Sequence, residues 1–471
     1  MIVIGGGLAG LSAGVALAEA GCAVRLFEQR PFLGGRATSY YLPDGEHVDN
    51  CQHVTFGCCT NLEDFYQRVG VADKIRFFDR LVLQDPQGRQ GSLEAGMFPA
   101  PLHMLGSFLN FAPLSLSDKL SIGRAMLAII GAKGRAPKSQ NGKPLSMLEW
   151  LRMQKQTPAA IERFWRTVLI SALSEELDKI DAQYGIDVLW KSTLMNRGGY
   201  RMGVPIVELG ALYDACKTSI ERAGGEVNLR QPVRALRFEG NRLIAAQFDG
   251  GREETADAFI LALPHDAVDE LLPAEIKTAD PNLANIGKIQ DAPITGVHLW
   301  FDREVMDAPF LALLDTTTQW IFNKTYLYGN SNGAKPEANE AKQYLQLVIS
   351  ASYDLLPKQR QEIVDLCLAE VRQALPKARE AQLVKSRVIK EAAATFSPQP
   401  GVDLWRPMQQ TKIRGLYLAG DWTNTGWPAT MEGAVRSGYL AAEAVLQAGG
   451  VTKKVLQKDL PADGFVRWFA S

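Results

Sequence analysis

The chain contains few residues of the types that build disulfides or metal centres. Its 471 residues include six cysteines and five histidines, and no two cysteines have the C-x-x-C spacing. Cys58 and Cys59 are adjacent and the histidines are scattered. The sequence therefore predicts no structural zinc site, no disulfide framework and no dithiol redox centre. The cysteines are interpreted as small buried apolar residues in a reducing compartment.

The chain also lacks an excess of charge of either sign. Lys and Arg number 51 and Asp and Glu number 52, which gives a net charge of −1. This balance argues against a nucleic-acid partner. No apolar run reaches the roughly 20 residues of a bilayer span. The first predicted strand begins at residue 2, so no signal peptide is expected before it. We expect a cytoplasmic enzyme, with peripheral contact at the inner face of the membrane as a further prediction.

A complete glycine motif lies at the beginning of the chain. Residues 2–28 read IVIGGGLAGLSAGVALAEAGCAVRLFE. A β-branched strand leads into Gly5, Gly7 and Gly10, and an apolar helix and a second strand follow, ending at Glu28. This is G-x-G-x-x-G within a βαβ unit, and it predicts a dinucleotide site. Glu28 is predicted to accept hydrogen bonds from ribose hydroxyls, which disfavours a 2′-phosphate.

Each position of the motif has a physical task. Gly5 lets the chain turn tightly out of the strand, and Gly7 lets a pyrophosphate approach the backbone. Gly10 lets the helix pack closely on the sheet. The helix begins near Leu8 and Ala9, where free N–H groups and the positive end of the dipole are predicted to face the phosphates.

A second glycine loop distinguishes FAD enzymes from enzymes that bind only NAD. Residues 29–36 read QRPFLGGR and follow the second strand directly. This loop resembles the R-x-G-G-R loop of the FAD-dependent amine oxidase and phytoene desaturase superfamily. The resemblance implies that the loop backbone passes along the diphosphate and that an arginine reaches toward it. The cofactor-binding residues predicted here are Gln29, Arg30, Gly34, Gly35 and Arg36.

The far end of the chain carries the other half of this resemblance. Residues 416–446 read LYLAGDWTNTGWPATMEGAVRSGYLAAEAVL, with a strand ending at Gly420 and Asp421. The resemblance implies that Asp421 bonds the ribityl chain of FAD. It also implies that backbone N–H groups at the start of the next helix face the flavin's pyrimidine edge. The predicted FAD-binding residues of this half are Gly420, Asp421, Thr430, Met431 and Glu432, together with Val233, which matches an adenine-contacting valine.

The order of these motifs predicts an α/β fold with two interleaved domains. The first is a Rossmann-like FAD-binding domain with a parallel central sheet, and the second is a substrate domain of helices and a mixed sheet. The FAD-binding domain is predicted from residues 1–57, 198–275 and 390–450. The substrate domain is predicted from residues 58–197 and 276–389, and residues 451–471 form a C-terminal tail.

Finer predictions follow from local patterns. Residues 62–200 are predicted to be mostly helical, and residues 243–248 and 256–263 to form a hairpin. Residues 292–301 and 343–351 alternate like strands of a separate sheet. The polar stretch 329–342 is predicted to be a mobile surface loop.

Several features restrict the reaction. There is no second G-x-G-x-x-G in mid-chain for a nicotinamide cofactor, so electrons must come from, or go to, an external partner. Amine oxidases of the superfamily usually carry an aromatic residue at the position of Thr430 and a lysine on a substrate-domain strand. The matching strand, 292–301, has no lysine, so amine oxidation is disfavoured.

Two apolar segments suggest an apolar substrate and contact with a membrane interface. They are residues 97–130 and the C-terminal GFVRWFAS, in which Phe465, Trp468 and Phe469 lie beside Arg467. The alternative interpretation is that these residues simply belong to the core.

A more specific resemblance lies at residues 47–61, which read HVDNCQHVTFGCCTN. This is similar to the D-N-G-Q-H-V motif of the squalene-associated FAD-dependent desaturases, understood as hydroxysqualene dehydroxylases. The similarity runs over nearly the whole chain, but Cys51 replaces the motif glycine, where a Cβ could crowd the backbone. The family's reaction is the reductive removal of an allylic hydroxyl from a C30 isoprenoid to give squalene.

The chemistry implied by this resemblance needs a dry site and a proton donor for the departing hydroxyl. The predicted catalytic residues are His53 and Asp49 as proton donors and Gln52 as a hydrogen-bond donor. In an alternative interpretation, Gln52 and His53 only bind the flavin or satisfy buried backbone groups.

Two other functions remain open at this stage. One is a carotenoid-type desaturase or another FAD-dependent oxidase, which runs hydride transfer in the opposite direction. The other is a non-catalytic flavoprotein scaffold of an isoprenoid pathway. The oligomeric state cannot be inferred from the sequence.

Overall fold

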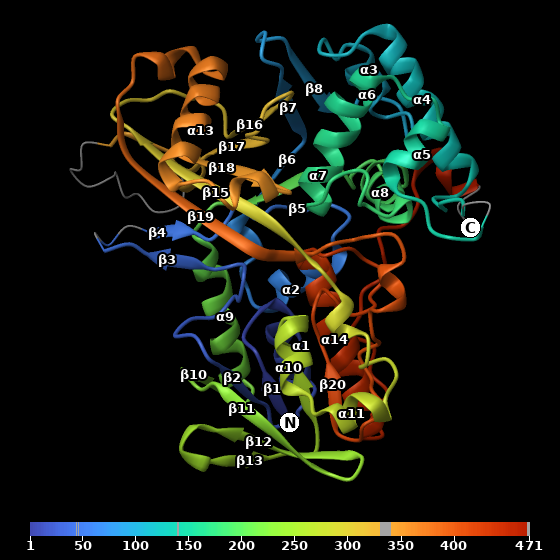
Figure 1. The fold of residues 1–471 in the computed structure, drawn as a ribbon, viewed down its shortest axis with the longest axis vertical. Helices are drawn as coiled ribbons and strands as arrows, with labels where there is room; N and C mark the ends of the chain where they lie inside the picture. The colour runs from blue at the N-terminus through green and yellow to red at the C-terminus, as the bar shows by residue number, and fades with distance from the viewer. Residues whose placement is uncertain (44, 46, 139–140, 330–340, 469–471) are drawn as a thin grey trace.

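The computed structural model describes residues 1–43, 45, 47–138, 141–329 and 341–468 (Figure 1). Most of the loop predicted at 329–342 lies outside the described residues, as does Phe469. The parallel sheet and its helices form one half of the molecule. The mixed sheet and a group of helices form the other half (Figure 1). The predicted α/β fold is confirmed.

The first half is built on a five-stranded parallel sheet whose strands come from three distant parts of the chain. In spatial order the strands are β10 (Glu226–Leu229), β2 (Arg25–Glu28), β1 (Ile2–Ile4), β14 (Phe259–Leu261) and β20 (Leu416–Leu418). The strands β1, β14 and β20 read IVI, FIL and LYL and are fully buried. Continuous apolar strands are expected where both faces of a sheet are covered. Here Val3 shares a core with helix residues such as Leu11, and Ile2 shares a core with Phe248 of an antiparallel strand.

Three long helices pack on this sheet or on one another: α1 (Leu8–Glu19), α9 (Leu209–Arg222) and α14 (Met431–Ala448). The contact between α1 and α14 is close because Gly438 has no side chain. A Cβ at that position would overlap the carbonyl oxygen of Ala9. This contact brings the N-termini of two helices, separated by more than 400 residues in sequence, to the same region.

The predicted hairpin is partly wrong. Its first arm is β12 (Arg242–Phe248), which pairs with β11 (Val233–Glu239) and β13 (Glu253–Thr255) in an antiparallel sheet. Residues Phe259–Leu261, predicted as part of the second arm, instead form β14 and pair with β1 and β20. An apolar run of this length suits either sheet, so periodicity alone could not assign it.

The second half contains a seven-stranded mixed sheet. In spatial order its strands are β19 (Leu383–Phe396), β15 (Asp291–Phe301), β18 (Gln343–Ser350), β17 (Trp320–Asn323), β16 (Phe310–Leu313), β7 (Arg80–Gln84) and β8 (Gln90–Glu94). The helix α13 (Arg360–Ala374) contributes Ile363 and Val371 to the core beside the sheet. The predicted domain boundary at residue 390 falls inside β19 and not between two elements.

Residues 62–200 are less helical than predicted. They include β7, β8 and β6 (Ile75–Phe78), and β6 joins β5 (Thr55–Phe56) and β9 (Met202–Pro205) in a small sheet. The remainder is mainly helical, as predicted. Its helices are α2 (Thr60–Arg68), α3 (Leu105–Leu109), α4 (Leu116–Gly131), α5 (Met147–Met153), α6 (Pro158–Ala160), α7 (Thr167–Leu173) and α8 (Ala182–Leu189).

The helical region has well-defined starts. Ser115 and Ser146 begin α4 and α5 with capping boxes in which Asp118 and Glu149 reciprocate. Π-helical turns at Ile161–Arg166 and Trp190–Leu194 precede α7 and follow α8. Among the described residues, no helix has both the length and the apolar character needed to cross a bilayer.

The remaining elements connect the two halves. A short hairpin consists of β3 (Ser39–Tyr41) and β4 (His47–Asp49). Helices α10 (His265–Leu271) and α11 (Ala274–Ala279) follow β14, and α12 (Lys324–Gly329) follows β17. The hairpin and α12 bring polar side chains to the border between the halves.

Candidate active site

The predicted FAD-binding residues lie around one cavity of about 1070 Å³. It extends from the start of α1 to the loop before α14. All but two of the predicted cofactor residues line it: Gly5, Gly7, Leu8, Ala9, Glu28, Gln29, Arg30, Gly34, Gly35, Arg36, Val233, Gly420, Asp421, Thr430 and Met431.

The two exceptions have other contacts. Gly10 packs against the turn before α1, where a Cβ would overlap the carbonyl oxygen of Gly5, in keeping with its predicted packing role. The Glu432 carboxylate accepts from the backbone N–H of Leu62 at 2.7 Å and from Asn61 Nδ2 at 2.9 Å. Burial raises the pKa of Glu432 despite these hydrogen bonds. Its side chain ties α14 to α2 and does not line the cofactor cavity.

The two glycine loops are pressed together at the start of α1. Gly35 has φ +62°, and a Cβ on it would lie 2.9 Å from the Cα of Gly7. Gly7 and Gly34 also form a parallel β-bridge. Only residues without side chains allow this approach, which leaves the N–H groups of the first turn of α1 facing the cavity.

The Glu28 carboxylate accepts hydrogen bonds from the backbone of both loops. Its Oε2 accepts from the N–H of Gly6 at 2.6 Å, and its Oε1 accepts from the N–H of Arg30 at 2.7 Å. Each carboxylate oxygen has a second lone pair. Glu28 lines the cavity, so it retains acceptor capacity for ribose hydroxyls.

Arg36 and Asp421 join the two ends of the chain across the cavity wall. Arg36 Nη2 lies 2.7 Å from Asp421 Oδ1, and Arg36 Nη1 donates to the carbonyl oxygen of Ala394 at 2.9 Å. Burial opposes the charge of Arg36, but Asp421 outweighs burial and raises the arginine pKa. The site therefore places a permanent cation beside the glycine loops, as a diphosphate requires.

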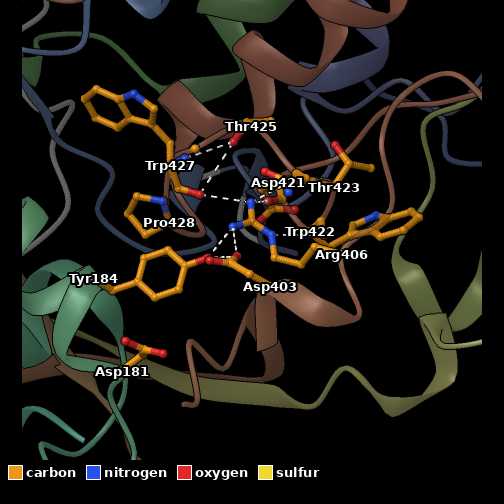
Figure 2. A network of polar contacts seen from close by, with 12 residues as sticks. Asp181, Tyr184, Asp403, Arg406, Asp421, Trp422, Thr423, Thr425, Trp427 and Pro428 are labelled. Atoms are coloured by element: carbon orange, nitrogen blue, oxygen red, sulfur yellow. Dashed lines mark hydrogen bonds and ion pairs between the residues drawn. The ribbon is translucent and has the colours of Figure 1, made fainter. Parts of the chain in front are cut away.

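The loop between Asp421 and α14 is held by Arg406, a residue that the sequence analysis missed (Figure 2). The Arg406 guanidinium is buried and also bonds Asp403 and the hydroxyl of Tyr184 on α8. Its other bonds go to the backbone carbonyl oxygens of Asp421 (3.1 Å), Trp422 (3.3 Å), Thr423 (2.6 Å) and Trp427 (2.9 Å). One side chain therefore fixes the shape of the whole loop.

The N-terminus of α14 lies beside the same cavity. The Thr430 hydroxyl caps the helix by accepting from the N–H of Gly433 at 3.0 Å, and the Thr430 carbonyl accepts from Ala434. Within the described part of the chain, the N–H groups of Met431 and Glu432 have no hydrogen-bond partner. Such a helix start stabilises negative charge next to it.

A second cavity of about 750 Å³ adjoins the first. Its wall includes many leucine, phenylalanine and methionine side chains, among them Leu105 of α3, Leu120 of α4 and Phe322 of the mixed sheet. Both cavities are lined by Gln52, Val54, Ser171, Ala172, Val348, Ser350, Thr430 and Met431. We call these residues the shared wall. An apolar ligand in the second cavity thus reaches the cofactor cavity at the start of α14.

The predicted catalytic residues are separated by the structure. Gln52 belongs to the shared wall, and His53 lines the cofactor cavity. His53 Nδ1 lies 3.0 Å from the carbonyl oxygen of Cys51, so Nδ1 carries the hydrogen and Nε2 is left as an acceptor. Burial lowers the pKa of His53, which favours the neutral ring.

Asp49 does not fit the predicted role of proton donor. It is buried, and it lines neither cavity. Burial opposes its ionisation, but the Lys324 ammonium and a hydrogen bond from Tyr328 lower its pKa below the ordinary value. The carboxylate is therefore ionised and turned away from both cavities, in a structural position.

Comparison with known proteins identifies the family. The model of the family described as flavin containing amine oxidoreductase matches residues 8–446. The chain belongs to this family. It is therefore an FAD-dependent oxidoreductase of the amine oxidase and desaturase superfamily.

Relatives of this flavin oxidoreductase include carotenoid enzymes. It is 27% identical to a 15-cis-phytoene desaturase from an Oncidium hybrid cultivar, over 95% of this chain and 78% of the relative. It is 25% identical to the 15-cis-phytoene desaturase of Synechococcus elongatus, over 94% and 95% of the two chains.

Solved structures confirm the fold of the flavin oxidoreductase. An oxidoreductase from Methanosarcina mazei matches with a TM-score of 0.71 and 19% identity, over 95% of this chain and 99% of that one. Cyclohexylamine oxidase from Brevibacterium oxydans matches with a TM-score of 0.67 and 16% identity, over 95% and 99%.

The flavin oxidoreductase has a buried lysine that the sequence analysis did not foresee. Strand β15 has no lysine, as noted, but Lys324 at the start of α12 lies next to the hairpin β3–β4. Its Nζ bonds Asp49 Oδ2 at 2.9 Å and Gln52 Oε1 at 2.8 Å. These partners are 275 and 272 residues away in sequence, so no local signal could have revealed the contact.

Cys51 is accommodated without backbone strain. It is not among the described residues with a positive φ, so the missing motif glycine is not needed for the backbone conformation here. Cys51 is buried and lines the cofactor cavity. Burial raises the pKa of its thiol to about 12, which keeps it protonated and unreactive. Among the described residues, no three potential metal ligands lie together.

Proposed function

We propose that this oxidoreductase reductively removes the allylic hydroxyl of hydroxysqualene, a C30 isoprenoid, to give squalene. The observation that carries the proposal is the apolar cavity, which meets the FAD cavity at a wall containing the polar side chain of Gln52. The resemblance of residues 47–61 to the dehydroxylase motif supports the same substrate. FAD, when bound in its reduced form, supplies a hydride.

The chain's own residues provide the remaining requirements. Gly7, Gly35 and Arg36 would hold the diphosphate of FAD, and Asp421 would bond its ribityl chain. The many leucines of the second cavity disfavour water next to the substrate, so an allylic cation would meet hydride before it met water. Gln52 is placed to donate a hydrogen bond to the departing oxygen. His53 lines the cofactor cavity with Nε2 as an acceptor, so we assign it the transfer of a proton that it must first take up at Nε2.

The second cavity suggests where the substrate enters. The residues Leu102, Leu105, Leu109, Leu116, Leu120 and Leu127 both line the cavity and are exposed at the surface. We call these six residues the leucine rim. A contiguous exposed apolar patch usually marks an interaction site. We propose that the rim dips into a membrane surface, from which an isoprenoid enters without crossing water.

The C-terminal tail lies near this rim. The N–H of Phe465 donates to the carbonyl oxygen of Ala100, and Val466 is fully buried. Trp468 is exposed. The proposed location is therefore the inner face of the membrane, with an external electron donor reaching the FAD site from the aqueous side.

A carotenoid-type desaturase is the second candidate, because the relatives described above are phytoene desaturases. A desaturase takes hydride from a hydrocarbon and needs an electron acceptor. The dehydroxylase needs reduced FAD and no acceptor. The two reactions therefore differ in the oxidation state of the enzyme that reacts.

The deciding experiment is anaerobic. The flavoprotein is reduced chemically, hydroxysqualene is added, and flavin absorbance and extracted products are followed. We expect the flavin to reoxidise as squalene forms. A flavin that stays reduced, combined with bleaching of the oxidised enzyme by phytoene, would replace the dehydroxylase by the desaturase. No spectral response to either substrate would indicate a non-catalytic scaffold.

One substitution tests the proton exchange. His53→Ala should abolish turnover while FAD content stays normal, because FAD is held by the glycine loops and Arg36. Normal turnover in this variant would remove His53 from the mechanism.

A further inference from the structure

The border between the two halves contains an ion pair that is almost completely shielded from water. Lys324 Nζ lies 2.9 Å from Asp49 Oδ2, and their side chains are 0% and 1% exposed. Removing two charges from water costs much of what their attraction returns. The pair therefore contributes little net stability, and its role lies in the groups that it keeps in position.

Asp49 fixes the position of the lysine. Its Oδ2 also accepts from the Tyr328 hydroxyl at 2.6 Å. Its Oδ1 accepts from the Ser39 hydroxyl at 2.8 Å and from the N–H of Leu209 at 3.1 Å. These bonds occupy the acceptor positions of the carboxylate. Asp49 therefore acts as an anchor and has no capacity left for a ligand.

Lys324 in turn fixes the orientation of Gln52. The ammonium can only donate, so Gln52 must present Oε1 to it, at 2.8 Å. The carbonyl oxygen of His53 can only accept, and it receives a bond from Gln52 Nε2 at 3.1 Å. These two contacts leave only one orientation of the amide.

One hydrogen of Gln52 Nε2 remains. An amide nitrogen carries two hydrogens, and within the described ranges only the bond to His53 uses one. Gln52 belongs to the shared wall of both cavities. The remaining N–H is thus a pre-oriented donor where the apolar cavity meets the FAD cavity.

We propose that Lys324 is a positioning residue, and that the Gln52 amide it holds recognises a hydroxyl oxygen on an otherwise apolar substrate. This inference rests on the proposed function and specifies it. The substrate class is an isoprenoid alcohol, because the corresponding hydrocarbon offers no acceptor to the donor. Loss of one hydrogen bond of this kind corresponds to about a tenfold change in affinity.

The test is a double-mutant cycle with Gln52→Leu, Lys324→Met and the combined variant. Steady-state kinetics with hydroxysqualene give KM and kcat, and inhibition by squalene reports hydrocarbon binding. We expect each single variant to raise KM about tenfold with little change in squalene inhibition. The combined variant should be no worse than Gln52→Leu alone, because Lys324 acts through Gln52.

A structural role for Lys324 gives a different result. The fold-increase in KM caused by Lys324→Met would then multiply with that caused by Gln52→Leu. Inhibition by squalene would weaken in the same variants. Lys324→Met leaves Asp49 buried without its cation, so Lys324→Met with Asp49→Asn is the charge-neutral variant, checked by FAD content. Lys277→Met, which breaks a pair with Asp269 at 3.1 Å whose side chains are 27% and 31% exposed, is the control outside both cavity walls and should keep KM unchanged.

The outcomes separate this inference from the proposed function. If the wild-type enzyme does not convert hydroxysqualene, the proposed function fails. If it does convert hydroxysqualene and Gln52→Leu keeps the wild-type KM, only the inference is overturned. If the Lys324 variants do not fold, Gln52→Glu decides, because a carboxylate paired with Lys324 cannot donate and KM must rise.

Discussion

The exposed leucines of α4 allow the proposed membrane contact to be tested quantitatively. Leu116, Leu120 and Leu127 lie at positions i, i+4 and i+11 of the helix, on one face. They are 67%, 67% and 70% exposed at the mouth of the apolar cavity. The opposite face, with Ile122 and Ile129, is buried. In water, this arrangement leaves three large apolar side chains without a partner among the described residues.

The expected effect of removing them follows from their exposed area. Full burial of a leucine side chain is worth about 1.5–3 kcal/mol, so burying two-thirds of it is worth about 1–2 kcal/mol. Three leucines together contribute about 3–6 kcal/mol. Replacing all three by serine should therefore weaken binding to lipid vesicles by a factor on the order of 100 to 10,000.

Flotation with phosphatidylcholine vesicles measures this binding directly. Leu404 is 82% exposed and lines neither cavity, so Leu404→Ser is the control for loss of an exposed leucine outside the rim. The triple variant should also show a larger rise in KM for substrate supplied in vesicles than for substrate in detergent micelles, where only the cavity lining is changed. Wild-type flotation of the triple variant, or equal loss with Leu404→Ser, would refute a membrane role for the leucine rim.

Three further predictions concern the FAD site and the buried network. Gly35→Ala forces a Cβ to within 2.9 Å of Gly7 Cα at φ +62°. Such left-handed strain costs about 1–2 kcal/mol, so FAD should bind at least about fivefold more weakly in a fluorescence titration of the apoprotein. Unchanged affinity would show that the loops do not need this contact. Arg406→Lys loses the fork that holds four carbonyl groups, and thermal unfolding should show a loss of about 2–4 kcal/mol together with weaker FAD binding. A wild-type Tm would show that the loop holds its own shape. Burial lowers the pKa of His298 to about 3. In the unfolded chain the same imidazole has its ordinary pKa of about 6.5, so on acidification it is protonated in the unfolded state before the folded state. The free energy of unfolding should therefore fall as pH drops below about 6.5, by about 2 kcal/mol at pH 5. His298→Asn should lose less stability over this range in urea unfolding, and an equal loss would assign the acid sensitivity to other groups.

The FAD half of the fold could be predicted from the sequence because its signals are local. The first glycine motif, the second glycine loop and the strand ending at Gly420 are each contained within about 30 residues. Their physical tasks depend on backbone geometry that particular residue types impose. For this reason nearly every residue predicted from those motifs lines one cavity.

The contacts that organise the substrate side could not be predicted in the same way. Strand β7 pairs with β16, more than 200 residues away, and hydrophobic periodicity does not identify partners at that distance. The same applies to Lys324, whose partners are 275 and 272 residues away. The carbonyl groups bound by Arg406 are only 15 to 21 residues away, but backbone carbonyls carry no sequence signal. The sequence analysis considered a lysine only on β15, whereas the structure brings one from α12.

The segment Asp49–His53 shows how a local turn changes the meaning of a motif. In an extended strand, Asp49 and Gln52 would point to opposite faces. Strand β4 ends at Asp49, and the following residues turn, so both side chains reach the same ammonium. The residue expected to donate a proton thereby becomes an anchor, and Gln52 becomes a polar group that lines both cavities.

The two candidate reactions make different demands on this wall. A desaturase acts on a hydrocarbon, to which an amide N–H contributes no binding energy, and an apolar side chain of similar volume would suit that substrate as well. Replacing a buried ion pair with apolar residues is often neutral or stabilising, so Lys324 and Asp49 bring no clear gain in stability. The desolvation cost of burying these two charges is offset if the Gln52 amide that they orient binds an oxygen of the substrate. The buried pair therefore favours an alcohol over a hydrocarbon as the substrate of this oxidoreductase.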